Sequence, residues 1–160
     1  MALNFDSKGN LVPNSNIKCT LAVFHEVFVE NMATPQRISL YEAFLKYSSE
    51  LKDILDGGEI ICWINGSYTT KKKSPNDLDL VTFINYRILD QKEQSLLDFK
   101  YPNSLSKFGL DAYIIKVYPR DHKNYPLYIG DEMYWMDKFD KNKRNRNGIK
   151  VPKGFIEITL

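Results

Sequence analysis

The amino-acid sequence predicts an α+β protein in which a small mixed β-sheet packs against helices. Two observations carry this prediction. Apolar residues recur at helical spacing through the first third of the chain, and several short apolar runs rich in Ile, Val and Tyr follow at intervals. The resulting order, two helices, two strands, a helix and a strand, is typical of α+β folds. The length of 160 residues, without an internal repeat or linker, suits one domain.

The N-terminal residues 1–18 are polar and contain turn signals at Lys8-Gly9-Asn10 and Val12-Pro13-Asn14. We expect them to form an extended arm that packs against a single domain of residues 19–160. Thr20 is a suitable N-cap for a first helix, in which apolar residues recur at helical spacing.

A second, longer helix is predicted to begin at Thr34-Pro35, with Thr34 as its cap and Pro35 in its first turn. It should end near Asp56-Gly57-Gly58. The expected strands after it are residues 59–65, 77–84, 110–118 and 155–160. The other expected helices are residues 87–99, a short one within 100–108, and 127–139 after a loop over 119–126.

Composition excludes several classes of protein. The net charge of +2 is too small to indicate a partner. No apolar run approaches the roughly 20 residues that cross a membrane, and no signal-peptide pattern begins the chain. Two cysteines make no disulfide framework, so we expect a reducing cytoplasm. The lone histidines His25 and His122 have no cysteine partners, which argues against zinc.

The stretch from Trp63 to Ile84 contains the residues with the clearest chemical meaning. An apolar run ends in Gly66-Ser67, and a basic connection leads to a second apolar run with Asp77 and Asp79 near its start. If residues 77–84 form a strand, the two carboxylates lie on one face, because side chains alternate along a strand. Paired carboxylates repel unless a cation lies between them, and oxygen ligands suit Mg²⁺ or Mn²⁺.

The residues before this acidic pair suggest a phosphate site. Gly66 permits close approach of the backbone to a ligand, and Ser67 can donate its hydroxyl and N–H to a phosphate. A phosphate site beside a divalent metal is the arrangement that phosphoryl or nucleotidyl transfer requires. A solvated surface pair of aspartates is the alternative interpretation.

This pattern resembles the signature of the DNA polymerase beta-type nucleotidyltransferase superfamily: Gly-Ser, roughly ten residues, then Asp-hydrophobic-Asp. It is most similar to a small bacterial and phage group of minimal nucleotidyltransferase-like proteins. Their core is matched here by Gly66, Ser67, Tyr68, Thr70, Lys72, Pro75, Asp77, Asp79 and Leu80, with Tyr68 where the group has Phe. Loose matches at both ends extend the resemblance over nearly the whole chain.

The resemblance implies that an NTP, with ATP as the first candidate, donates its NMP to a hydroxyl with the help of Mg²⁺ or Mn²⁺. Asp77, Asp79 and Asp111 would hold the metal, and Asp111 would also serve as the general base. Asp111 lies early in an otherwise apolar run, where packing alone would not favour a charge. A strand-end acid that reaches solvent is the alternative for Asp111.

Two basic segments are candidates for neutralising a triphosphate. Lys71-Lys72-Lys73 lies between the Gly-Ser turn and the acidic pair, and Lys72 matches the lysine of the similar group. Residues 138–153 hold seven lysines and arginines against Asp140. The resemblance implies that Arg146 and Lys153 lie near the cleft. A nucleic-acid footprint, a docking face for an acidic partner and a mobile surface loop are alternatives for this segment. For the three lysines, a solvated loop is the alternative.

The leading hypothesis is therefore a metal-dependent nucleotidyltransferase whose acceptor is a protein, an RNA or a small molecule. Minimal relatives in the superfamily include antitoxins that modify a partner toxin, so a toxin–antitoxin or defence context is consistent with the resemblance. The alternative is a non-catalytic module that binds nucleic acid or protein through residues 138–153. A third hypothesis is an antitoxin that acts mainly by complex formation. No membrane partner is expected, and the oligomeric state stays open.

Overall fold

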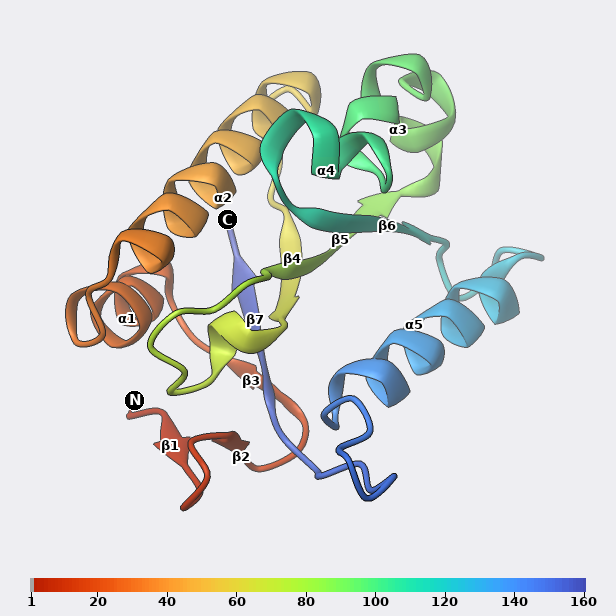
Figure 1. The fold of residues 1–160 in the computed structure, drawn as a ribbon. Coiled ribbons are helices and arrows are strands. Elements are labelled where there is room, and N and C mark those ends of the chain that lie inside the picture. The colour runs from red at the N-terminus through yellow and green to blue at the C-terminus, as the bar shows by residue number, and fades with distance from the viewer. Residues whose placement is uncertain (1) are drawn as a thin grey trace.

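The computed structural model of the protein describes residues 2–160, and its centre is a five-stranded mixed sheet with strand order β3-β7-β4-β5-β6 (Figure 1). β7 pairs antiparallel with β4, and β4 pairs antiparallel with β5. The outer pairs, β3 with β7 and β5 with β6, are parallel. The strands are β3 (Asn16–Lys18), β4 (Ile61–Asn65), β5 (Asp79–Asn85), β6 (Asp111–Val117) and β7 (Phe155–Thr159). The predicted α+β class is confirmed.

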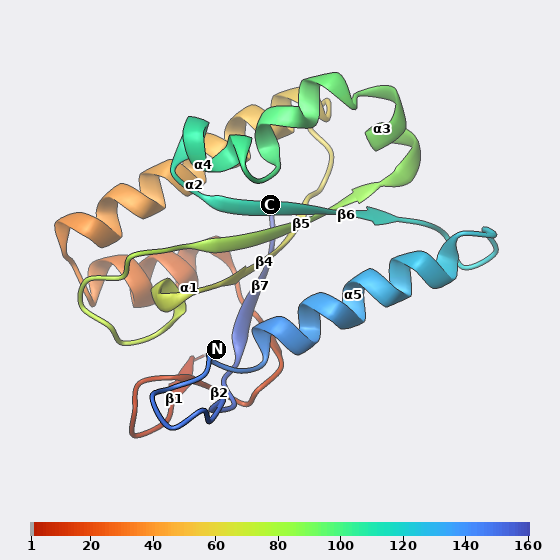
Figure 2. The same ribbon diagram turned by 45° about the vertical axis from the view of Figure 1, so that its right-hand side comes forward.

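The helices lie on both faces of this sheet. Figure 2 shows α2 and α4 on one side and α5 on the other. The helices are α1 (Leu21–His25), α2 (Pro35–Ile54), α3 (Tyr86–Gln91), α4 (Asn103–Phe108) and α5 (Tyr125–Phe139). A π-helical turn, Glu26–Glu30, continues α1, and 3₁₀ turns occupy Ser67–Thr69 and Gln94–Phe99.

Each face of the sheet has its own apolar cluster, because alternate residues of a strand point to opposite faces. On the α2 side, Cys62, Ile64 and Leu80 belong to the larger cluster. On the α5 side, Trp63 and Val81 pack with Ile115, Phe139 and Phe155. The α5 face therefore has the smaller core. At the end of the sheet where β4 ends and β5 and β6 begin, polar residues take the place of this core.

Several predicted helix boundaries are confirmed. The Thr20 hydroxyl accepts a hydrogen bond from Val23 N–H, and the Thr34 hydroxyl accepts one from Arg37 N–H, as N-caps do. The ambiguous segment 100–108 contains α4, which ends at Gly109 in the left-handed conformation with φ 73°. None of the helices in residues 2–160 is long and apolar enough to cross a membrane.

Three predictions need correction. Residues 87–99 do not form one helix: α3 ends at Gln91, Lys92 leaves the helical conformation with φ −115° and ψ 23°, and a separate 3₁₀ turn follows over Gln94–Phe99. The Lys92 amine donates to the carbonyl of Ile54 and to Asp56. Helix α5 begins at Tyr125, so Pro126 stands in its first turn rather than in a loop, a position that tolerates proline.

The third correction concerns the N-terminal arm. Asn4–Phe5 (β1) and Leu11–Val12 (β2) pair with each other, and Leu11 is fully buried. β3 is an edge strand of the main sheet. Within the described residues 2–18, the arm is thus part of the domain, whereas its first residue lies outside the described residues.

Candidate functional site

A row of three polar side chains crosses the sheet where β4 ends and β5 and β6 begin. Asn65, the last residue of β4, pairs with Asp79, the first of β5, and Asp79 pairs with Asp111, the first of β6. Residues directly opposite each other on neighbouring strands share a face of the sheet. The structure therefore brings Asp79 and Asp111 together, as predicted, and adds Asn65, which the sequence analysis missed.

Asp77 reaches this row differently from the prediction. β5 begins at Asp79, so Asp77 stands in the preceding loop rather than on a strand face. Its Oδ1 accepts hydrogen bonds from Ser67 N–H at 2.9 Å and from Ser67 Oγ at 2.6 Å. Ser67 Oγ in turn accepts a hydrogen bond from Asn76 N–H at 3.1 Å. The donors of Ser67 that were predicted to bind phosphate hold Asp77 in this structure.

Gly66 is required where the end of β4 meets the acidic loop. Its φ is +84°, and a Cβ there would lie 3.1 Å from the carbonyl oxygen of Asp77 and 3.2 Å from the nitrogen of Asp79. Both the backbone conformation and the contact therefore favour glycine. The close approach at Gly66 is to the Asp77–Asp79 backbone. The predicted approach of a ligand to Gly66 stays a prediction.

Lys153 lies close enough to Asp77 and Asp79 to interact with their charges, and it stands just before β7. Its side chain is nearly inaccessible, with the residue 3% exposed, and its Nζ donates a hydrogen bond to the Gly66 carbonyl at 3.1 Å. Burial lowers the pKa of the Lys153 amine to about 8, although Asp79 and Asp77 oppose that change. Its predicted place at the site is consistent with this position.

The carboxylates differ in how readily they ionise. Burial, together with the negative charges of Asp77 and Asp111, raises the pKa of Asp79 to about 6. Burial also opposes ionisation of Asp77, but the hydrogen bonds from Ser67 and the charge of Lys143 outweigh it and lower the Asp77 pKa. The site thus combines Asp77, whose ionised form is favoured, with Asp79, whose ionised form is disfavoured. Such a difference is expected where like charges share one cavity, because they repel each other.

These residues line a cavity of about 800 Å³ that is open to solvent. On one side Tyr113 and Trp135 form an aromatic wall, with ring centroids 4.4 Å apart. The volume is within the range of small-molecule sites. The polar and charged lining residues are Asn10, Asn65, Ser67, Thr70, Asp77, Asp79, Asp111, Asp137, Lys138, Lys141, Asn142, Lys143, Arg144, Lys150 and Lys153.

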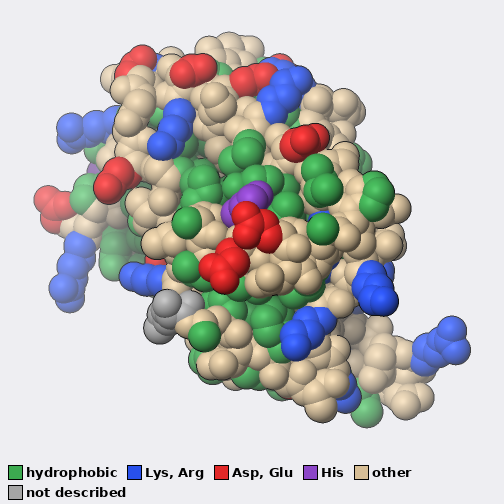
Figure 3. All heavy atoms as spheres, turned by 90° about the vertical axis from the view of Figure 1, so that its left-hand side faces the viewer, with side chains coloured by type: hydrophobic (Ala, Val, Ile, Leu, Met, Phe, Trp, Pro, Cys, Tyr) green, Lys and Arg blue, Asp and Glu red, His purple; other side chains and the backbone are tan. Residues whose placement is uncertain are grey.

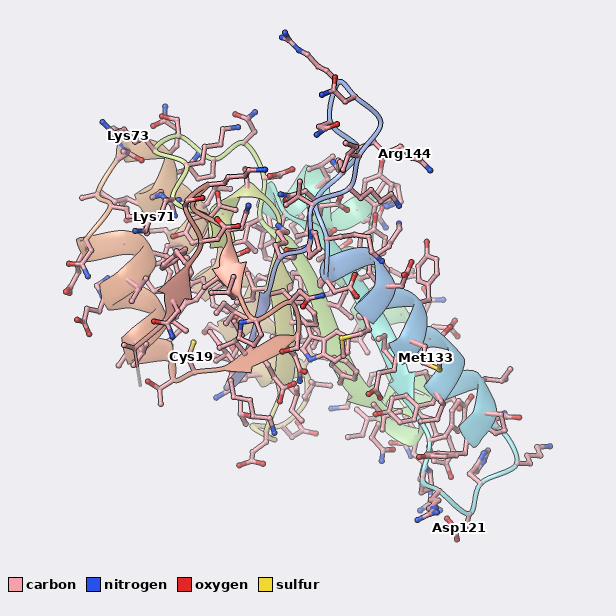
Figure 4. All side chains as sticks on the ribbon, turned by 90° about the horizontal axis from the view of Figure 1, so that it is seen from below. Cys19, Lys71, Lys73, Asp121, Met133 and Arg144 are labelled. Atoms are coloured by element: carbon pink, nitrogen blue, oxygen red, sulfur yellow. The ribbon has the colours of Figure 1, made fainter. Side chains whose placement is uncertain are left out.

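The C-terminal basic segment supplies the cations of the cavity. Residues 141–152 form a hairpin, in which Asn142 N–H donates to the Val151 carbonyl at 2.8 Å and Asn145 N–H to the Ile149 carbonyl at 2.9 Å. The Asn142 amide also donates to Asn10 Oδ1 at 3.1 Å, which ties the hairpin to the N-terminal arm. Figure 4 shows Arg144 on this hairpin, at the edge of the molecule.

Two predicted contacts fall outside the cavity. Arg146 is exposed near the hairpin tip and is not among the lining residues, whereas its neighbour Arg144 is. Lys72 is also exposed and does not line the cavity. The backbone explains the second result: the carbonyl of Lys72 accepts hydrogen bonds from Arg37 Nε at 3.2 Å and Nη2 at 2.6 Å, which draws the lysine loop toward α2.

Arg37 is a structural residue of this site that sequence reasoning missed. It is fully buried, and its guanidinium also donates to the carbonyls of Phe28, Tyr68 and Thr70. It therefore fixes the loop between Ser67 and the acidic pair. In the sequence it is one polar residue in an amphipathic helix, and no signal distinguishes it.

Two other residues of the site could have been found from the sequence. Asn65 is two residues before Ser67, and Tyr113 is two residues after Asp111 on the same predicted strand.

Within residues 2–160, no three His, Cys, Asp or Glu side chains are placed as a ready-made metal site. The donor set nevertheless fits Mg²⁺ or Mn²⁺. The Oδ1 atoms of Asp111 and Asn65 are buried without a hydrogen-bond partner, and the Asp79 carboxylate is disfavoured by its like-charged neighbours. Mg²⁺ usually binds one or two carboxylates and completes its shell with water and substrate phosphates.

Comparison with family models finds one match, over residues 3–159. The chain belongs to a family of unknown function (DUF6932). The match spans almost every residue described above, so the cavity lies within the region that defines the family. Comparison with curated proteins gives no match, and comparison with solved structures gives none either.

Proposed function

We propose that this protein is a metal-dependent nucleotidyltransferase, which moves a nucleoside monophosphate from an NTP onto an acceptor hydroxyl. The observation that carries the proposal is the register pairing of Asp79 with Asp111 in one cavity with Asp77. Carboxylates at the adjoining ends of two strands, beside clustered cations, can hold a divalent metal and a polyphosphate together. The motif resemblance and the cavity then support the same chemistry.

In the proposed reaction, the acceptor hydroxyl oxygen bonds to the α-phosphorus of the NTP. The bond from that phosphorus to the bridging oxygen of the β-phosphate breaks, and pyrophosphate leaves. The hydroxyl proton passes to a carboxylate. Asp111 fits that role, because its Oδ1 is buried and accepts no hydrogen bond within the described residues. Asp77, Asp79 and Asp111 would hold Mg²⁺, which when bound neutralises phosphate charge.

The remaining groups would bind and orient the nucleotide. Lys143, Arg144 and Lys150 line the cavity from the hairpin and would neutralise the triphosphate. The aromatic wall of Tyr113 and Trp135 offers a surface on which a base can stack. Ser67 keeps Asp77 oriented through its two hydrogen bonds. The donor NTP is thereby held at both its charged and its aromatic end.

The test is calorimetric titration of Mg²⁺ with non-hydrolysable analogues of ATP, GTP, CTP and UTP. Wild type should bind at least one analogue in a metal-dependent way, and the double variant Asp79→Ala/Asp111→Ala should not. Asp121→Ala is the matched control, since Asp121 is exposed and lies at the far end of α5 from the hairpin (Figure 4). Failure of folded wild type to bind any triphosphate would contradict the proposal.

A second function is favoured by the exposure of the hairpin. Arg144, Arg146 and Lys150 are exposed, and together they present a cationic tip. A non-catalytic module that holds RNA, DNA or a protein through residues 138–153 would use this surface. Nucleic-acid binding that falls steeply with salt and needs neither metal nor triphosphate would favour this function over catalysis.

A further inference from the structure

A second cavity, of about 760 Å³, lies between the N-terminal arm, the end of the π-helical turn and the lysine loop. Its lining residues are Leu3, Phe5, Val27, Asn31, Met32, Ala33, Thr34, Lys71 and Lys73. Five of these side chains are apolar, two are cationic, and none of the described lining residues is acidic. Among the residues that the structure describes, the cavity shares none of its lining with the carboxylate site. Figure 3, which looks onto the face of α1 and α2, shows apolar side chains near the centre of that surface, with histidine and acidic side chains among them.

The two lysines are placed at this cavity by their backbone. Lys71 N–H donates to the Gly9 carbonyl at 2.9 Å, and the Thr34 hydroxyl donates to the Lys73 carbonyl at 2.9 Å. Between them Arg37 holds the carbonyl of Lys72. Lys71 and Lys73 line the cavity, whereas Lys72 does not.

The charge of Lys71 lies directly against the apolar wall. Its Nζ is 5.1 Å from the centroid of the Phe5 ring, a cation–π distance. Neither Lys71 nor Lys73 forms an ion pair among the described residues. Figure 4 shows both lysines on the side of α1 and α2, across the molecule from α5. Two unpaired cations thus border one apolar pocket.

We propose that this cavity binds an aliphatic carboxylate, with its chain on Leu3, Val27 and Met32 and its anionic head between Lys71 and Lys73. The volume is within the range of small-molecule pockets, which bury an apolar body and fix it by a few polar groups. Charge complementarity decides the head group: a cationic head would meet two lysines, and a neutral one would leave them unpaired. The inference is independent of nucleotidyl transfer.

The experiment is calorimetric titration of decanoate, below its micelle concentration, into the full chain. Decyltrimethylammonium, which has the same tail and a cationic head, is titrated in parallel. We expect saturable 1:1 binding of decanoate, weakened about tenfold by Lys71→Glu/Lys73→Glu through loss and reversal of both charges. Lys72→Glu is the matched control and should leave the affinity within about twofold. Circular dichroism and urea unfolding confirm that each variant is folded.

Three results would overturn the proposal. The first is a wild type that does not bind decanoate. The second is equal binding by wild type and Lys71→Glu/Lys73→Glu, which would mean that the lysines play no part. The third is equal affinity for decyltrimethylammonium, which would show an apolar surface without head-group selection. A peptide of alternating Leu and Glu is titrated last. If this peptide binds and decanoate does not, the cavity is assigned to a partner protein and the proposal is wrong.

Discussion

The two basic segments of this protein look alike in the sequence and differ completely in what they face. Lys71-Lys72-Lys73 stands between Ser67 and Asp77, yet its three side chains are exposed and none lines the carboxylate cavity. Residues 138–153 are remote from the aspartates in sequence, but over the described part of the chain they supply the six lysines and arginines that line this cavity. Proximity along the chain therefore does not predict which charges meet a site.

The physical cause is the way each segment is anchored. The lysine loop is held by its carbonyls, which accept hydrogen bonds from the buried Arg37, so its side chains turn outward. The C-terminal segment is held through Lys153, whose amine reaches the Gly66 carbonyl, and through pairing across the hairpin. The lysine loop is thus anchored by its backbone carbonyls, whereas the C-terminal segment is anchored by a side-chain amine and by backbone pairing across the hairpin. Four substitutions, made in three experiments, test this contrast and the carboxylate site between the two segments.

Arg37→Met should have the largest effect, because it removes the anchor of the lysine loop. The carbonyls of Phe28, Tyr68, Thr70 and Lys72 would lose their charged donor. We expect the free energy of unfolding to fall by about 3 kcal/mol or more, since unsatisfied buried acceptors are costly. Urea unfolding measures it, with Arg120→Met at an exposed position as control. A loss equal to that of the control would show that Arg37 does not anchor the loop.

Lys153→Met and Lys72→Met separate the two segments at the carboxylate cavity. Lys153 is buried and interacts with the charges of Asp77 and Asp79, whereas Lys72 is exposed outside the cavity. We expect Lys153→Met to weaken binding of Mg²⁺ with the NTP analogue by about thirtyfold, or about 2 kcal/mol, because a buried charge is lost. Lys72→Met should leave the affinity unchanged within error. Calorimetry measures both affinities. Equal losses of affinity in the two variants would show that the two segments do not differ in their contact with the carboxylate cavity.

Asp79→Asn tests the electrostatic strain at the sheet end and should have the smallest effect. The pKa of Asp79 is about 6 in the folded protein, against an ordinary value of 3.8. Between those values the folded state binds more protons than the unfolded state, so wild type loses stability as pH rises through that window. Without metal, Asp79→Asn should therefore be more stable than wild type by about 1–2 kcal/mol at neutral pH.

The check is urea unfolding of both proteins in metal-free buffer across this range of pH. The advantage of Asp79→Asn should disappear as the pH falls to about 4, where the Asp79 carboxyl is protonated in wild type as well. Asp121→Asn, at an exposed position, should show no such dependence. A constant difference at every pH would mean that the gain does not come from the ionisation of Asp79.

Much of the fold was predictable because its signals are local. Thr20 and Thr34 marked the helix starts, and the alternation in residues 155–160 marked β7, since capping and periodicity are properties of neighbouring residues. The break at Lys92 was not predictable. At this position the Lys92 amine contacts the carbonyl of Ile54, at the end of α2, and Asp56 in the turn after it, and both are remote from Lys92 in the sequence. The same limit explains why β3 was expected as part of an arm: its partner β7 is at the other end of the chain.

By itself, the sequence determined the α+β class and the aspartates of the candidate site. The Gly-Ser turn, the alternation of polar and apolar residues and the charge in an apolar run are each written in adjacent residues. Only the tertiary structure decided that Asn65, Asp79 and Asp111 form one row, that Ser67 holds Asp77, and that Lys153 rather than Lys72 meets the carboxylates. Strand register and the buried hydrogen bonds of Arg37 and Lys153 join residues remote in sequence, so no local pattern encodes them.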